Sequence, residues 1–171
     1  MKIVLNDANI LIDVIHIELI DVLFKISHLE LKTTDFVFSE LHEDQKLIIQ
    51  EFVDSGNLII IESNEEDLNQ ISGLLSRSRG LSFEDCSVWY FAKFNGGILL
   101  TGDGALRKKS ANDGVEVRGI LFVFDQLLLA NLITFEFAIL KINQLYNINE
   151  RLPQDAKYIR LDLWRRAEHI T

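Results

Sequence analysis

The sequence predicts an α/β fold with a parallel sheet, and three observations lead to this prediction. Short apolar runs alternate with segments in which apolar residues recur every three or four positions, the pattern of strands joined by crossover helices. Two of these runs, at residues 2–6 and 98–101, are each followed closely by an aspartate, Asp7 and Asp103. The chain has 171 residues and 48% hydrophobic content, enough to bury a core as one domain.

In the first part of the chain, strands are predicted at residues 2–6, 30–34 and 58–62, where β-branched residues are frequent. Helical spacing covers residues 10–27, with a break near His16, and residues 36–53, with Asp35 as the expected cap and Glu40 near the start. Right-handed crossovers should join the strands.

In the second part, Ser63 or Asn64 is expected to cap a helix whose first turn is acidic, and Ser82 to cap a helix over residues 83–94. A strand at 98–101, a short basic helix at 104–110 and a short last strand at 115–117 follow. Two apolar helices are predicted at 120–129 and 134–145. The remaining tail is interpreted as helical packing or as an interaction arm.

The negative charge is concentrated in one segment. The chain has 17 basic and 26 acidic residues, a net charge of −9. Residues 35–67 hold ten of the acids and one base, and the rest of the chain holds sixteen of each. A negatively charged partner such as nucleic acid is therefore not excluded by the overall charge.

Cysteine content and hydropathy predict a cytoplasmic protein with no membrane partner. Cys86 is the single cysteine, which excludes an intrachain disulfide and fits a reducing compartment. The chain enters a strand at once, without the basic and apolar segments of a signal peptide. The longest apolar stretch, residues 119–137, is interrupted by polar residues and is shorter than the ~20 residues of a membrane span.

The acidic residues predict a metal site. If the first and fourth strands are neighbours, Asp7 and Asp103 open into one crevice at the carboxyl edge of the sheet, with Asp85 on the helix that leads into the second of these strands and Glu40 as a fourth acid. Carboxylates gathered in this way must share protons or hold a hard cation. Mg²⁺ or Mn²⁺ held by carboxylates supports phosphodiester hydrolysis.

Basic residues near these acids fit a polyanionic substrate. Arg107, Lys108 and Lys109 closely follow Asp103, and we expect them to position the phosphate backbone without selecting its sequence. The alternative is that they form a solvated helix end that complements the helix dipole.

Each acid also has a purely structural interpretation. Asp7 is a common type of cap for the helix that follows it, and Asp103 fits a turn residue in Thr-Gly-Asp-Gly. Asp85 fits a solvated helix surface, with Glu84 as its rival for the site. Glu43 lies less than one turn after Glu40 and is an alternative to it.

The order and spacing of several motifs resemble the PIN-domain family. The resemblance covers roughly residues 1–123 and rests on Val4-Leu5-Asn6-Asp7-Ala8-Asn9-Ile10-Leu11-Ile12, Ser39-Glu40-Leu41, Asp85 followed by Ala92, Gly96-Gly97, and Leu100-Thr101-Gly102-Asp103. It implies a three-layer α/β/α domain with sheet order 3-2-1-4-5 over residues 1–123. Residues 124–171 resemble the carboxyl extension of a subgroup of prokaryotic PIN-domain proteins, and we expect a helical extension packed on this domain.

The resemblance also implies a function. It implies a Mg²⁺- or Mn²⁺-dependent endoribonuclease that leaves a 5′-phosphate and a 3′-hydroxyl, with Asn9 and Thr101 as orienting residues. The metal ligands and catalytic acids would be Asp7, Glu40, Asp85 and Asp103. Many family members are VapC-like toxins of toxin–antitoxin pairs, which implies a homodimer and a small antitoxin as further partners.

Two features depart from the family pattern and support a second hypothesis. Many relatives carry another acid two positions after the last aspartate, where this chain has Ala105, and the helix predicted at 36–53 is unusually acidic. The alternative is a catalytically degenerate PIN-like domain that binds other proteins. A phosphotransfer domain with Asp7 as nucleophile ranks third, because Asp7-Ala8-Asn9 lacks the paired acid of that class.

Overall fold

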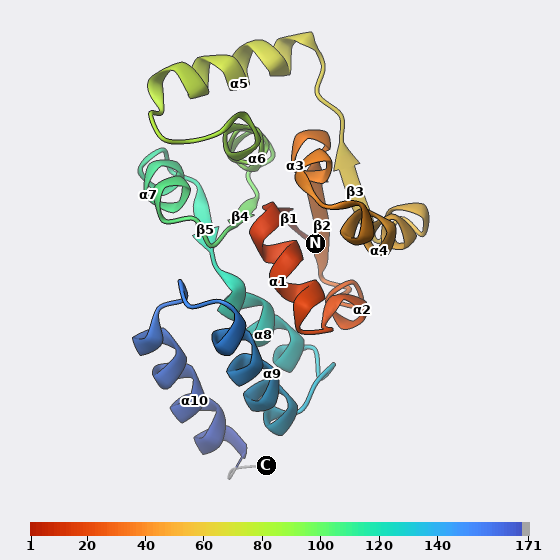
Figure 1. The fold of residues 1–171 in the computed structure, drawn as a ribbon, viewed down its shortest axis with the longest axis vertical. Coiled ribbons are helices and arrows are strands. Elements are labelled where there is room, and N and C mark those ends of the chain that lie inside the picture. Colours follow the sequence, from red (N-terminus) through yellow and green to blue (C-terminus); the bar gives the residue numbers. More distant parts are fainter. Residues whose placement is uncertain (169–171) are drawn as a thin grey trace.

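The computed structural model describes residues 1–168 and contains a five-stranded parallel sheet (Figure 1). The strand order is β3-β2-β1-β4-β5, which confirms the predicted order 3-2-1-4-5. The strands are β1 (Lys2–Asn6), β2 (Leu29–Thr34), β3 (Leu58–Ile61), β4 (Ile98–Leu100) and β5 (Glu116–Arg118). Because β1 lies at the centre with β4 beside it, the ends of the two strands that precede Asp7 and Asp103 are neighbours.

Helices follow the strands as expected for crossover connections. They are α1 (Ala8–His16), α2 (Ile20–Leu23), α3 (Asp35–Glu40), α4 (Glu43–Asp54), α5 (Glu65–Arg77), α6 (Phe83–Phe94), α7 (Gly104–Asn112), α8 (Ile120–Leu129), α9 (Phe135–Ile148) and α10 (Gln154–Glu168). Helix α6 packs on β1, β2 and β4, and α5 covers α6 (Figure 1). Leu5, Val88 and Leu99 are fully buried in the resulting core.

The register of β1 and β4 fixes the carboxyl edge of the sheet. Asn6 pairs with Leu100, and the backbone N–H of Asp7 donates to the carbonyl of Leu100 at 3.0 Å. The chain therefore leaves both strands at the same level, and the two loops that follow lie side by side.

The prediction of one helix over residues 36–53 was wrong. The chain forms α3 and α4 instead, and Leu41 between them is extended (φ −66°, ψ 146°) with its side chain buried. Helix α4 begins at Glu43 with His42 as its N-cap, because the side chain of Gln45 accepts a hydrogen bond from the His42 N–H at 3.0 Å. Glu40 therefore ends a short helix rather than lying near the start of a long one.

The expected cap at Asp35 was also wrong. Thr34 is the N-cap of α3, and its hydroxyl accepts a hydrogen bond from the N–H of Val37 at 3.2 Å. Asp35 is the first residue of the helix, where its charge still suits the helix dipole.

The carboxyl-terminal helices pack on the rest of the chain. Helix α10 lies against α9, and Trp164 is buried with its ring 5.8 Å from that of Phe124 in α8. Asn149, at the end of α9, donates to the carboxylate of Asp13 in α1 at 3.0 Å. Helical packing thus accounts for the tail within the described residues, while the predicted boundary between 123 and 124 falls inside α8 and stays a prediction.

No helix within residues 1–168 is long and apolar enough to cross a membrane.

Candidate functional site

Asp7 is the most buried acid at the carboxyl edge of the sheet, with 4% of its surface exposed. It is the N-cap of α1, and its Oδ1 accepts a hydrogen bond from the N–H of Ala8 at 2.7 Å. Its Oδ2 accepts from Nδ2 of Asn9 at 2.6 Å and from Oγ1 of Thr101 at 2.5 Å. Asp7 is therefore both a helix cap and a carboxylate fixed by two neighbouring side chains.

The same side chains join the loop after β4 to the start of α1. Oγ1 of Thr101 accepts a hydrogen bond from the N–H of Asp103 at 3.0 Å, and Oδ1 of Asn9 accepts from the N–H of Gly102 at 2.8 Å. A Cβ at Gly102 would lie 3.2 Å from Oδ1 of Asn9, so a larger residue would crowd this contact. Thr101 itself is fully buried. The network holds the backbone at Asp103 close to Asp7.

Asp103 and Asp85 are helix caps as well. Asp103 is the N-cap of α7, and its Oδ1 accepts from the N–H of Leu106 at 2.7 Å. Oδ2 of Asp85 accepts from the N–H of Ser82 at 2.9 Å, which completes a capping box at the start of α6. Both acids therefore have a structural role as helix caps, which differs from the solvated surface position considered for Asp85 and the turn position considered for Asp103.

The pKa of Asp7 is raised to about 6 from its ordinary value of 3.8. Burial is the main cause, and repulsion by the charge of Asp85 adds to it, while the hydrogen bonds from Thr101, Ala8 and Asn9 oppose the rise. A buried carboxylate with this pKa is at a functional site more often than elsewhere.

Repulsion among the acids shows that the structure brings them together. Burial raises the pKa of Asp85, and the charges of Asp103 and Glu84 raise it further. The pKa of Glu40 is raised by desolvation and then by the charges of Glu84 and Asp85. Asp85 is thus electrostatically linked to the other three predicted acids. Glu84, which was considered a rival, lies near the same site and adds a fifth charge.

The donor set fits a hard divalent cation in its chemistry. None of Asp7, Glu40, Asp85 and Asp103 forms an ion pair with a basic side chain in the described part of the chain. Carboxylate oxygens without a counter-ion are the ligands that Mg²⁺ and Mn²⁺ prefer. Among residues 1–168, however, no three acidic, histidine or cysteine side chains stand close enough to hold an ion as they are placed.

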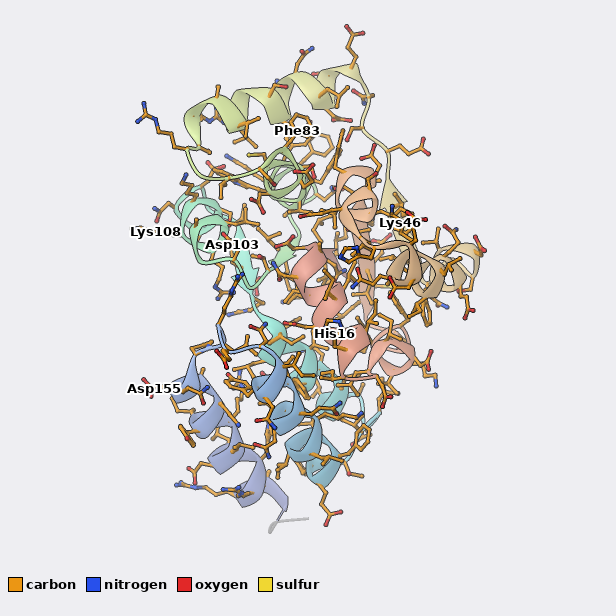
Figure 2. The ribbon with its side chains drawn as sticks, viewed as in Figure 1. His16, Lys46, Phe83, Asp103, Lys108 and Asp155 are labelled. Atoms are coloured by element: carbon orange, nitrogen blue, oxygen red, sulfur yellow. The ribbon has the colours of Figure 1, made fainter. Side chains whose placement is uncertain are left out.

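The three basic residues that closely follow Asp103 do not form one patch. Arg107 is half-buried, and its Nη1 donates to the carbonyl of Thr101 at 3.0 Å. Lys109 donates to the carbonyl of Arg79, on another side of α7. Lys108 is exposed and lies at the outer edge of the molecule in Figure 2. Of the three, only Arg107 contacts the loop that carries the acids.

A cleft of about 990 Å³ lies beside Asp103, and Asn9 and Thr101 also line it, whereas Asp7, Glu40 and Asp85 do not. Its walls also include Arg118 and Arg151, which were not singled out from the sequence. Arg151 lies in the turn between α9 and α10. The Arg-Leu-Pro segment between two helices is only a weak indication that Arg151 belongs to a site. Nothing in the sequence shows where this turn lies relative to Asp103.

Comparisons with known proteins agree with the fold. A family model described as a PIN domain matches residues 3–164, which include α8, α9 and most of α10. Endoribonuclease Nob1 of Methanocaldococcus jannaschii is 31% identical over 91 residues, which cover 53% of this chain and 46% of that protein. The chain thus spans about half the length of this curated relative.

Two solved structures share the fold at low sequence identity. PAE2754 from Pyrobaculum aerophilum has a TM-score of 0.54 and 18% identity, and the match covers 74% of this chain and 98% of that one. VapBC-1 from nontypeable Haemophilus influenzae has a TM-score of 0.50 and 14% identity, over 70% of this chain and 98% of the matched chain.

Proposed function

Because the chain belongs to the PIN-domain family, we propose that it is a metal-dependent endoribonuclease that hydrolyses phosphodiester bonds in RNA. The observation that carries this proposal is the position of Asp7 and Asp103 at the ends of the neighbouring strands β1 and β4, joined by hydrogen bonds to Thr101. The charge of Asp85 raises the pKa of Asp7 and of Glu40, which supports the assignment of these two acids to the same site. The relative named as an endoribonuclease supports the same reaction.

The four acids would hold Mg²⁺ or Mn²⁺. When bound, such an ion polarises a phosphoryl oxygen and lowers the pKa of water. Asn9 and Thr101 hold the Asp7 carboxylate in one orientation through their hydrogen bonds to Oδ2. Glu40 is exposed, and its pKa is raised by desolvation and by the charges of Glu84 and Asp85, a repulsion that a bound cation would relieve.

Family resemblance carries the remaining parts of the proposal. We infer a cytoplasmic protein that forms a homodimer and is the toxin partner of a small antitoxin. The solved VapBC-1 structure shares its fold with this chain and is in keeping with this inference.

A second candidate function is a degenerate PIN-like domain that binds other proteins. Two observations favour it: the acids of residues 1–168 are not close enough to hold an ion as they stand, and Ala105 is exposed next to them without a carboxylate. A metal-binding enzyme requires the cation to draw these side chains together, which the interaction domain does not require.

RNA cleavage with Mn²⁺, Mg²⁺ or EDTA separates the two functions. We expect the parent protein to cleave only with a divalent ion, and Asp103→Asn to lose at least about 100-fold in rate, since even residues behind the ligands cost about 10–100-fold in metal sites. Asp44→Asn, an exposed acid in α4, is the control and should leave the rate unchanged.

Equal cleavage by the parent and Asp103→Asn would contradict the nuclease proposal. A folded parent that cleaves no RNA and gains no thermal stability from Mn²⁺ would favour the interaction domain.

A further inference from the structure

The cleft next to the acids is bounded on its other side by the carboxyl-terminal helices. Its lining residues run from Asn9 and Asp103 along α1 and past β5 to the end of α9 and the start of α10. Its volume of about 990 Å³ is at the upper end of the range for small-molecule pockets. The cleft is therefore large enough to hold a ligand of several chemical groups beside Asp103.

Four arginines from four different segments line this cleft: Arg107, Arg118, Arg151 and Arg160. Nη1 of Arg107 is bound to the carbonyl of Thr101, which leaves its other N–H groups for a ligand. Arg151 is exposed and has no ion-pair partner within residues 1–168. Guanidinium groups bind phosphate through paired hydrogen bonds, so these arginines are suited to a phosphate chain. Asp13 and Glu150 also line the cleft and offset part of their charge.

The other two arginines are held by acids. Arg118 pairs with Glu116 at 2.9 Å, and Arg160 pairs with Asp125 at 2.6 Å. These ion pairs fix the two guanidinium groups at the wall of the cleft and reduce their net charge. Arg151 is therefore the arginine of the carboxyl-terminal segment that is most available to a phosphate.

Apolar side chains line the same cleft as the arginines. Phe122, Leu121 and Leu152 line the cleft and are only partly buried. Base faces pack on aromatic and apolar side chains without regard to sequence. Cationic groups alternating with such surfaces in one channel are the combination by which proteins bind single-stranded nucleic acid.

The distribution of charge favours the same direction of approach. Residues 104–168, which form the far walls of the cleft, have ten basic and eight acidic residues, whereas residues 35–67 have one and ten. The acidic segment includes β3, at the opposite edge of the sheet from β5. An RNA whose scissile phosphate lies at the acids is repelled on the β3 side and meets arginines on the β5 side.

We propose that this cleft holds a single-stranded segment of the RNA substrate, and that Arg151 binds one of its backbone phosphates. This inference rests on the proposed ribonuclease function and adds to it a binding role for the carboxyl-terminal helices. An acidic peptide would bind the same arginines, but its binding would not require the cleft to lie next to the acidic site.

The test is binding without catalysis. A short fluorescein-labelled single-stranded RNA is titrated in EDTA with the parent, with Arg151→Glu and with Arg165→Glu, and its anisotropy is followed at low and at physiological salt. Arg165 is exposed on α10 outside the cleft, so its reversal changes the net charge equally. Circular dichroism and melting temperatures confirm that all three are folded.

We expect Arg151→Glu to weaken binding roughly tenfold and to reduce the salt dependence by about 0.7 in slope, the value for one phosphate contact on a single strand. Arg165→Glu should stay within about twofold of the parent, since distant exposed charges are screened. Equal weakening by both variants, or no RNA binding by the parent, would overturn the proposal.

A labelled poly-glutamate peptide provides the competing partner. If the peptide binds in an Arg151-dependent way and the RNA does not, the cleft is a peptide site and the proposal is wrong. If the RNA binds through Arg151 but is never cleaved with Mn²⁺, the proposed nuclease function fails while the RNA cleft stands.

Photocrosslinking gives an independent measurement. RNA that contains 4-thiouridine should crosslink to peptides that cover residues 118–122 and 148–153. Crosslinks confined to residues 35–67 would overturn the assignment.

Discussion

The two edges of the sheet differ sharply in charge. On the β3 side, residues 35–67 have a net charge of −9, while on the β5 side residues 104–168 have a net charge of +2. Asp7 and Asp103 lie between these two regions, at the ends of β1 and β4. The net charge of the whole chain therefore does not describe the electrostatic potential at either edge of the sheet. The potential near a site is set by charges within about 8–10 Å.

The two regions also differ in how their charges are held. On the β5 side Arg118 and Arg160 are fixed by ion pairs with Glu116 and Asp125. On the β3 side the ion pair between Lys46 and Glu43 joins two residues of the same helix. The β5 side thus presents oriented cations, whereas the β3 side presents solvated anions that repel RNA.

The largest predicted effect tests whether the β5 side is an integral part of the fold. Trp164 is 5% exposed and lies against Phe124, so Trp164→Ala removes a large buried ring. We expect a loss of about 3–5 kcal/mol in the free energy of unfolding, measured by urea denaturation.

Leu163 is the matched control for this variant. It is the preceding residue of α10 and is 50% exposed, so Leu163→Ala should change stability by no more than about 0.5 kcal/mol. If the two variants are equally stable, α10 is not packed as described. The carboxyl-terminal helices would then not be a fixed part of the β5 side.

The next effect concerns Asp7, which lies between the two regions. Its pKa in the folded protein is about 6 against an ordinary 3.8, so the folded state favours the neutral acid. The stability of the parent should therefore fall as pH rises from about 4 to about 6, with a full cost of about 3 kcal/mol at higher pH. Asp7→Asn removes this cost but fits the hydrogen bonds from Asn9 and Thr101 less well.

We expect Asp7→Asn in EDTA to be about 1–2 kcal/mol more stable than the parent at neutral pH, with the gain lost near pH 4. Unfolding free energies at both pH values provide the measurement. Asp44→Asn changes an exposed acid on the β3 side and should show no such gain. A variant less stable than the parent at neutral pH would show that the hydrogen bonds of the carboxylate outweigh its burial.

The smallest predicted effect tests whether the acidic β3 side influences RNA binding. We expect the triple variant Glu43→Gln, Asp44→Asn and Glu51→Gln, all exposed residues of α4, to bind RNA within about twofold of the parent at physiological salt, because exposed charges beyond a Debye length are screened. Fluorescence anisotropy with the same RNA measures it. Strongly increased affinity would mean that RNA crosses the β3 side, contrary to the path proposed here.

The sequence by itself determined most of the fold. Alternating apolar runs and helical spacing predicted the five strands at about their observed positions along the chain. Capping residues such as Ser82 and Asn64 correctly marked the starts of helices. These features are local, so neighbouring residues suffice to specify them. The break at Leu41 was missed, because it depends on the burial of one side chain and on the cap supplied by Gln45.

The four acids could be proposed from the sequence, because each follows a strand or begins or ends a helix in a recognised motif. Their convergence around Asp85 could not be derived from spacing, since it depends on β1 and β4 pairing across more than 90 residues of chain. The cleft depended still more on the tertiary structure. Arg118 reaches the cleft because β5 pairs with β4. Arg151 reaches it only because the carboxyl-terminal helices fold back against α1. A sequence specifies local conformation through neighbouring residues, but a binding surface is formed by residues that only packing brings together.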